Sequence, residues 1–242
     1  MKAELFIPCH LDQFYPQTAM NTYKLLRKAG VEVSYNPDQT CCGRFAYNTG
    51  YTDEAIDLGN RFMDAITKSD YIVVPSAACV AHIVTKGEKM FFNTPNHHLY
   101  KEVRKHIYEL TDFLVNVLHY DNFGASFPHK VTYHDCCSAK GFLGIADQPR
   151  QLLSKVEGLE LIEMKQSDMC CGSDHSLMLY NEPVASAMAN RKVQNAMNTG
   201  AEYIVSTDMT CLMHIGAYAE KQNLPVKVIH IADVLASGWQ NS

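Results

Sequence analysis

The chain has 242 residues, of which 47% are hydrophobic, and its formal net charge at pH 7 is −5. This length allows one large domain or two small ones, and the apolar content is sufficient for a buried core. Basic residues such as Lys130, Lys140 and Arg150 are scattered, whereas a nucleic-acid surface needs a basic patch. Composition and charge therefore argue against nucleic-acid binding.

No segment indicates export or membrane insertion. The apolar start of the chain, Met1–Cys9, is shorter than the apolar region of a signal peptide. No apolar run approaches the roughly 18–20 residues that span a bilayer. We therefore expect a cytoplasmic protein without a membrane span. In a reducing cytosol, clustered cysteines are more often metal-binding or redox-active than paired in disulfides.

Strand and helix patterns alternate through the first half of the chain. Tyr71–Pro75 is a continuous apolar run, typical of a strand that is buried on both faces of a parallel sheet. Asp53–Lys68 carries apolar residues at helical spacing. The pattern predicts strands at Lys2–Pro8, Val31–Tyr35 and Tyr71–Pro75, and helices at Thr18–Ala29, Asp53–Lys68 and Tyr100–Tyr120.

The second half repeats this order. The pattern predicts helices at Gln148–Val156 and Pro183–Asn198. It predicts strands at Lys130–Tyr133, Leu159–Met164, Tyr203–Val205 and Val226–Ile231. Alternating strands and helices favour parallel sheets. We therefore predict an α/β fold with two pseudo-symmetric halves, each with a parallel sheet flanked by helices. Residues 121–129 have the composition of a linker, so we expect two domains, 1–122 and 123–242.

Eight of the nine cysteines form two copies of one pattern. Each copy has a single cysteine, a Cys-Cys-Gly motif and a Cys-x-x-His motif. Cys9, Cys79 and Cys211 each come after a predicted strand, and ligands of parallel α/β sheets collect beyond the carboxyl ends of the strands. We therefore expect the four cysteines of each copy to converge. The first set is Cys9, Cys41, Cys42 and Cys79, and the second set is Cys137, Cys170, Cys171 and Cys211.

The ligand type and count point to a metal centre in each half. Thiolates favour iron–sulfur clusters, zinc or copper(I), and four of them suit either a cluster or a closed zinc site. Adjacent cysteines such as Cys41 and Cys42 reach one ion with difficulty, whereas a cluster accepts them at different irons. The pattern therefore favours a cluster over zinc. Gly43 and Gly172 are expected to adopt a positive φ, which lets the chain turn both thiolates inward.

Four segments carry a resemblance to a known family: Cys41–Tyr51, Tyr71–Ser76, Val131–Cys137 and Cys211–Ile215. With them the chain resembles the cysteine-rich iron–sulfur proteins named for their Cys-Cys-Gly motif, and above all the small stand-alone members that serve lactate utilization. The resemblance implies one or two iron–sulfur clusters, of the 4Fe-4S type, on the two cysteine sets. It also implies an electron-transfer subunit of a cytoplasmic complex that oxidises L-lactate to pyruvate with partner subunits, one of them iron–sulfur.

The roles of three residues stay open. Larger relatives often end each motif in Cys-x-x-Cys, whereas this chain has His82 and His214 there, so neither motif offers five cysteines. Each histidine could be a ligand or a supporting residue. Cys136, the unmatched cysteine, could be a fifth ligand, a redox partner of Cys137 or an inert buried thiol.

Two other functions also remain open at this point. One is thiol–disulfide reduction at a cluster, as in the heterodisulfide reductase relatives, and the other is a zinc-stabilised assembly module without catalysis. The chain has no nucleotide-binding glycine motif, and no catalytic acid or base stands out. His134 and Asp135 directly follow the predicted strand Lys130–Tyr133, and adjacent side chains on a strand point to opposite faces. This disfavours an acid–base pair and leaves a supporting role for them.

Overall fold

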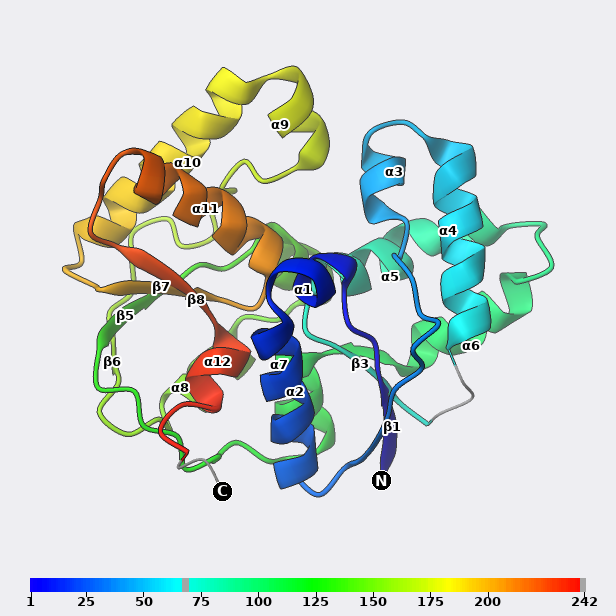
Figure 1. The fold of residues 1–242 in the computed structure, drawn as a ribbon, viewed down its shortest axis with the longest axis horizontal. Helices are drawn as coiled ribbons and strands as arrows, with labels where there is room; N and C mark the ends of the chain where they lie inside the picture. The colour runs from blue at the N-terminus through cyan, green and yellow to red at the C-terminus, as the bar shows by residue number, and fades with distance from the viewer. Residues whose placement is uncertain (67–69, 240–242) are drawn as a thin grey trace.

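The computed structural model describes residues 1–66 and 70–239 (Figure 1). Two four-stranded sheets, with parallel pairing throughout, form the centres of two similar halves. The order of the first sheet is β2 (Glu32–Ser34), β1 (Lys2–Leu5), β3 (Ile72–Val74) and β4 (Ile107–Glu109). The order of the second sheet is β6 (Glu160–Leu161), β5 (Lys130–Tyr133), β7 (Tyr203–Ser206) and β8 (Lys227–His230). The predicted α/β fold with two similar halves is confirmed.

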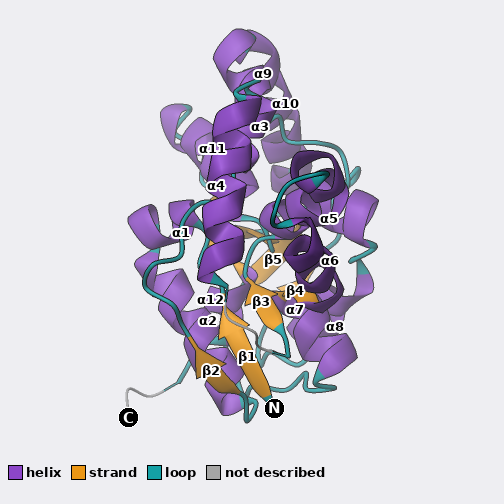
Figure 2. Cartoon of the chain, turned by 90° about the vertical axis from the view of Figure 1, so that its right-hand side faces the viewer, coloured by secondary structure: helices purple, strands orange, loops and turns teal. Residues whose placement is uncertain are grey.

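Helices flank both sheets (Figure 2). Those of the first half are α1 (Cys9–Phe14), α2 (Pro16–Lys28), α3 (Arg44–Asn48), α4 (Thr52–Ala65), α5 (Ala77–Phe91), α6 (His97–His106) and α7 (Leu110–Asp112), followed by the π-helical segment η1 (Phe113–Val117). Those of the second half are the π-helical segment η2 (Ser138–Leu143), α8 (Asp147–Leu153), α9 (His175–Tyr180), α10 (Glu182–Met197), α11 (Met209–Lys221) and α12 (Ile231–Leu235). In the described part of the chain, no helix combines the length and apolar character needed to cross a membrane.

The prediction of one helix over Tyr100–Tyr120 is wrong. α6 ends at His106, and the next three residues form β4, which pairs with β3 from Ile72↔Ile107 to Val74↔Glu109. Burial of Ile107 beside the apolar strand β3 overrides the helical spacing of the apolar residues around it. The missed strand gives the first half the same fourth strand that was predicted for the second half.

The other predicted elements are present, most of them with slightly different ends. β5 has the predicted bounds, and β1 is shorter than predicted because pairing stops before the chain turns into α1. The predicted helix Asp53–Lys68 corresponds to α4 as far as Ala65, and residues 67–69 lie outside the described part. Residues 121–129 contain a single isolated bridge, at Ser126. The division into domains 1–122 and 123–242 stays a prediction.

Each contact between the halves has an equivalent on the other side. α2 of the first half packs against α12 of the second, and the equivalent helix α8 packs against α7. Likewise α1 packs against α11, and the equivalent segment η2 packs against α5. One buried cluster takes residues from both sheets, including Leu5, Val73, Val131 and Val205. This reciprocal packing relates the halves by a pseudo-twofold axis, and it brings the cysteine-bearing ends of the two sheets toward each other.

Candidate metal centres

The cysteines of the first set lie together beyond the ends of β1 and β3. Cys9 begins α1, and its Sγ lies 3.7 Å from the Sγ of Cys41. The thiol of Cys42 contacts those of Cys41 and Cys79, and Cys79 lies in the first turn of α5. All four side chains line one cavity. The structure therefore brings together the four residues that the sequence predicts as ligands.

The second set repeats this arrangement at the ends of β5 and β7. The thiol of Cys170 contacts those of Cys137 and Cys171, and Cys171 also contacts Cys211. Cys211 lies in the first turn of α11, the equivalent of α5. All four line a second cavity. Cys136, the unmatched cysteine, is buried beside Cys211.

The glycine of each Cys-Cys-Gly motif has the expected conformation. Gly43 has a φ of 82° and Gly172 has a φ of 88°, values that favour glycine. In this geometry the backbone N–H of Gly43 donates to the Sγ of Cys41 over 3.4 Å, and that of Gly172 donates to the Sγ of Cys170 over 3.4 Å. The prediction of a positive φ at both positions is confirmed.

Hydrogen bonds prepare one thiol of each set to be a thiolate, the form that binds metals. The thiols of Cys42 and Cys9 lower the pKa of Cys41 by donating to its sulfur, and Gly43 adds its N–H. In the second set, Cys137 and Cys171 lower the pKa of Cys170 in the same way. The first cysteine of each adjacent pair is therefore the most acidic thiol that these contacts produce.

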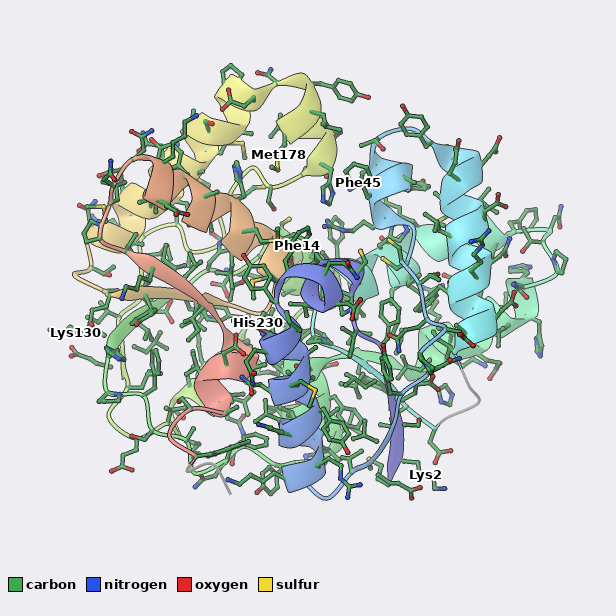
Figure 3. All side chains as sticks on the ribbon, viewed as in Figure 1. Lys2, Phe14, Phe45, Lys130, Met178 and His230 are labelled. Atoms are coloured by element: carbon green, nitrogen blue, oxygen red, sulfur yellow. The ribbon has the colours of Figure 1, made fainter. Side chains whose placement is uncertain are left out.

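Each cavity is completed by residues of the opposite half. His82 and Lys86 of α5 line the cavity of the second set. Met178 of α9 lines the cavity of the first set, together with Phe14 and Phe45, and Figure 3 shows Phe45 and Met178 on facing elements. The first cavity is thus bordered by exposed apolar side chains, since these three are 39–68% exposed. Arg44, Ser173 and Thr210 line both cavities.

Arg44 is a positive charge between the two cysteine sets. Its guanidinium donates to the Oγ1 of Thr210 over 3.3 Å. Burial opposes its charge, but Asp208 and the thiols of Cys79, Cys42 and Cys211 raise its pKa. Burial likewise opposes the charge of Asp208, yet Arg44 keeps the pKa of this carboxyl below its usual range. The site therefore carries a partly buried cation that can balance negative charge in either cavity.

Four histidines around the cavities have a buried ring nitrogen without a hydrogen-bond partner among the described residues. These nitrogens are Nε2 of His10, His82 and His134 and Nδ1 of His175. Burial lowers the pKa of His10, His82 and His134 to about 4, so these rings are neutral near pH 7. His214 differs, because its Nε2 lies 3.0 Å from the carbonyl oxygen of Ala185. The two histidines of the Cys-x-x-His motifs are therefore not equivalent.

His134 and Asp135 lie just beyond the end of β5 and contact different groups. Asp135 forms a two-pronged ion pair with Arg150, at 2.8 Å for both contacts. A ring nitrogen of His134 and the Sγ atoms of Cys171 and Cys211 all lie within 4.8 Å of one another. Sequence reasoning gave His134 a supporting role because alternation along a strand does not show what lies on each face. The structure places it among the thiols.

The donors of each set fit a metal centre. Zinc binds sulfur at about 2.3 Å, which places the four sulfurs of a closed site about 3.8 Å apart. Cys9 and Cys41 meet this spacing. Four thiols are also the ligand set of an iron–sulfur cluster, in which they bind different irons.

Comparison with known proteins gives consistent matches over the whole chain. The model of a family described as "Cysteine-rich domain" matches residues 3–84 and again residues 131–216. Lactate utilization protein A of Geobacillus thermodenitrificans is 36% identical over 239 residues, which cover 97% of this chain and 98% of that protein. Lactate utilization protein A 2 of Bacillus cereus is 34% identical over 252 residues, with coverage of 98% and 99%.

Among solved structures, a hypothetical protein from Helicobacter pylori shares the fold, with a TM-score of 0.63 at 12% identity. The match covers 99% of this chain but 49% of that one, so the chain spans about half of that protein's length. The duplicated Cys-Cys-Gly pattern, the two equivalent halves and the near-complete alignment with the relatives agree. The chain therefore belongs to the cysteine-rich domain family named for the Cys-Cys-Gly motif, together with the lactate utilization A proteins.

Proposed function

We propose that this chain is an iron–sulfur electron-transfer subunit of a complex that oxidises L-lactate to pyruvate. The observation that carries the proposal is the convergence of four thiols in each half, at the facing ends of two parallel sheets. The names of the lactate utilization relatives suggest lactate as the substrate. Oxidation of L-lactate to pyruvate releases two electrons and two protons, and this chain would pass the electrons between partner subunits.

The cysteine sets would hold the clusters, and the surrounding residues would tune them. An iron–sulfur cluster, when bound, accepts and releases single electrons at a potential set by charge, burial and hydrogen bonds to sulfur. Gly43 and Gly172 supply N–H groups to sulfur in both halves, and Ser173 donates from its hydroxyl to the Sγ of Cys211 over 3.4 Å. Arg44, which lines both cavities, favours the more negative state of either centre. These contacts raise the potential relative to unassisted thiolates.

A zinc-stabilised assembly module is the second candidate. It is favoured by one observation, the separation of 3.7 Å between the sulfurs of Cys9 and Cys41, which suits tetrahedral zinc. The adjacent cysteines of each set favour a cluster instead, because neighbouring thiolates can bind different irons. The two candidates differ in colour, in iron and sulfide content, and in their response to dithionite.

The experiment that tests the proposal uses the chain purified under strictly anaerobic conditions, alone and together with its partner subunits. In the complex, L-lactate should bleach the visible absorption of the clusters, while D-lactate serves as the control. The isolated chain should be bleached by dithionite but not by L-lactate, because it has no hydride-accepting cofactor motif. A complex that oxidises L-lactate while the chain's absorption stays unchanged would contradict electron transfer through this subunit.

A further inference from the structure

We propose that His134 is a ligand of the metal centre in the second cysteine set, through Nε2, and that the two centres of the chain are chemically unequal. This inference deepens the proposed function and depends on it only in requiring a metal centre at the second set. The first set offers four thiols. The second set would offer the same four thiols and an imidazole.

The position of His134 is that of a ligand. Its ring nitrogen forms a compact group with the Sγ atoms of Cys171 and Cys211, all within 4.8 Å of one another. The exposed fractions of His134, Cys171 and Cys211 are 0%, 1% and 6%, so water does not compete freely for the donor atoms. Imidazole is a common ligand of iron and zinc. Geometry and chemistry therefore agree at this position.

The hydrogen bond on the other ring nitrogen fixes the tautomer that a ligand needs. Nδ1 of His134 lies 3.3 Å from the carbonyl oxygen of Ser167, which can only accept. The hydrogen of the neutral ring therefore sits on Nδ1, and Nε2 carries a free lone pair. Nε2 is buried without a hydrogen-bond partner among the described residues. A metal ion would satisfy it, whereas without one the cost of burying this nitrogen would be uncompensated.

A buried lysine holds the carbonyl that orients His134. Nζ of Lys192 donates to the carbonyl oxygens of Gln166 and Ser167, over 2.8 Å and 2.9 Å. Lys192 is fully buried in α10, so its charge depends on these acceptors and on the nearby anionic groups. Partners that orient a metal-binding histidine through its second nitrogen are a regular feature of metal sites.

The first half has an apolar pair at the equivalent positions. The backbone N–H of His134 donates to the carbonyl oxygen of Val205 over 2.8 Å. In the first half, the backbone N–H of Phe6 donates to the carbonyl oxygen of Val73 over 3.0 Å. Gly43 lies against Ala55 of α4, and Gly172 lies against Ala185 of α10. Phe62 and Lys192 each follow that alanine by seven residues (62 − 55 and 192 − 185), so they occupy equivalent positions. The rings of Phe6 and Phe62 pack edge to face, with their centroids 4.7 Å apart. One backbone thus carries a phenylalanine pair beside the first set and a histidine–lysine pair beside the second.

This equivalence provides a matched variant. His134→Phe copies the residue that the first half carries on the same backbone, and the double variant His134→Phe/Lys192→Phe restores the whole apolar pair if the single variant folds poorly. His82→Phe is the control, because His82 also has a free buried Nε2 and lines the same cavity.

The test is pulsed electron paramagnetic resonance of the full chain, labelled with ¹⁵N-histidine and reduced with dithionite. We expect the coupling of a directly bonded nitrogen in the wild type and in His82→Phe, and its loss in His134→Phe or in the double variant. The inference is overturned if the wild type shows no such coupling, if His134→Phe retains it, or if His82→Phe removes it.

Metal analysis of the same samples separates this inference from the proposed function. If the protein contains zinc and no acid-labile sulfide, the electron-transfer function fails, but the ligand assignment is still tested by replacing zinc with Co²⁺. The Co²⁺ absorption bands should then change in His134→Phe and stay unchanged in His82→Phe. Co²⁺ bands that are unaffected by His134→Phe would overturn the assignment.

Discussion

The hydroxyl of Ser76 donates to the Oδ2 atom of Asp208 over 3.1 Å, which joins the N-terminal caps of two equivalent helices across the pseudo-twofold axis. Ser76 precedes the helix of Cys79, and Asp208 precedes the helix of Cys211. The same carboxylate oxygen accepts the backbone N–H of Ala78 over 2.7 Å. One buried carboxylate thus ties together the two helices that present the last cysteine of each set.

This link predicts that Asp208→Asn destabilises the whole protein. An amide cannot accept every hydrogen bond that the carboxylate accepts, and it removes the negative charge that Asp208 offers to the partly buried Arg44. We expect a loss of about 3 kcal/mol in the free energy of unfolding, measured by urea denaturation. The control is Asp53→Asn, an exposed aspartate of α4, with an expected change below about 0.5 kcal/mol. A loss at position 208 no larger than that of the control would contradict the role given to this carboxylate.

Glu109 gives the protein a pH-dependent stability. Burial raises the pKa of this carboxyl to about 7, against hydrogen bonds from Thr111 and Thr207 that lower it. The folded pKa exceeds the ordinary value of 4.5, so the folded state holds the proton of Glu109 more tightly than the unfolded state does. The resulting contribution to stability is complete below about pH 4.5 and is lost as the pH rises through about 7. The loss amounts to at most about 3 kcal/mol.

The variant Glu109→Gln should flatten this dependence. The free energy of unfolding of the wild type should fall more steeply between about pH 4.5 and about pH 7 than that of the variant. Urea denaturation at several pH values measures both curves. Parallel curves would show that the burial of Glu109 does not control stability in this range.

Alanine at the motif glycines should damage the metal centres. A Cβ at Gly43 would lie 2.6 Å from the carbonyl oxygen of Ala55, and one at Gly172 would lie 2.8 Å from that of Ala185. Both oxygens belong to helix backbones that cannot move aside cheaply. We expect Gly43→Ala to lower metal binding mainly at the first set, and Gly172→Ala mainly at the second.

A matched control separates this clash from conformational strain. Gly200 also has a positive φ, of 73°, but nothing lies within 4 Å of its Cβ position. Gly200→Ala should therefore cost about 1–2 kcal/mol through strain alone and leave the metal content unchanged. Equal metal loss in Gly200→Ala and Gly172→Ala would show that the contact with Ala185 has no special importance.

Cys171 and Cys136 should differ in their effect on metal content. Cys171 lies between the thiols of Cys170 and Cys211, whereas Cys136 contacts Cys211 and accepts the backbone N–H of Ala139 over 3.3 Å. We expect Cys171→Ser to remove most of the metal of the second set and Cys136→Ser to remove little. Equal losses of iron would mean that Cys136 is itself a ligand.

Much of the fold could be predicted because its signals are local. Buried parallel strands are often short apolar runs, and β3 and most of β7 lie in such runs. β4 was missed because its three residues continue the apolar spacing of α6, and only pairing with β3 makes them a strand. The convergence of each cysteine set follows from strand ends, which the sequence also reveals. The exchange of His82 and Met178 between the cavities depends on how the halves pack, which no local pattern encodes.

The central claim is tested most directly by iron and acid-labile sulfide analysis of the anaerobically purified chain. Four thiols in each half predict iron and sulfide in equal amounts. Each single variant, Cys42→Ser or Cys171→Ser, should lose about half of both. The double variant should contain almost none. A colourless wild-type protein that contains stoichiometric zinc and no sulfide would contradict the account.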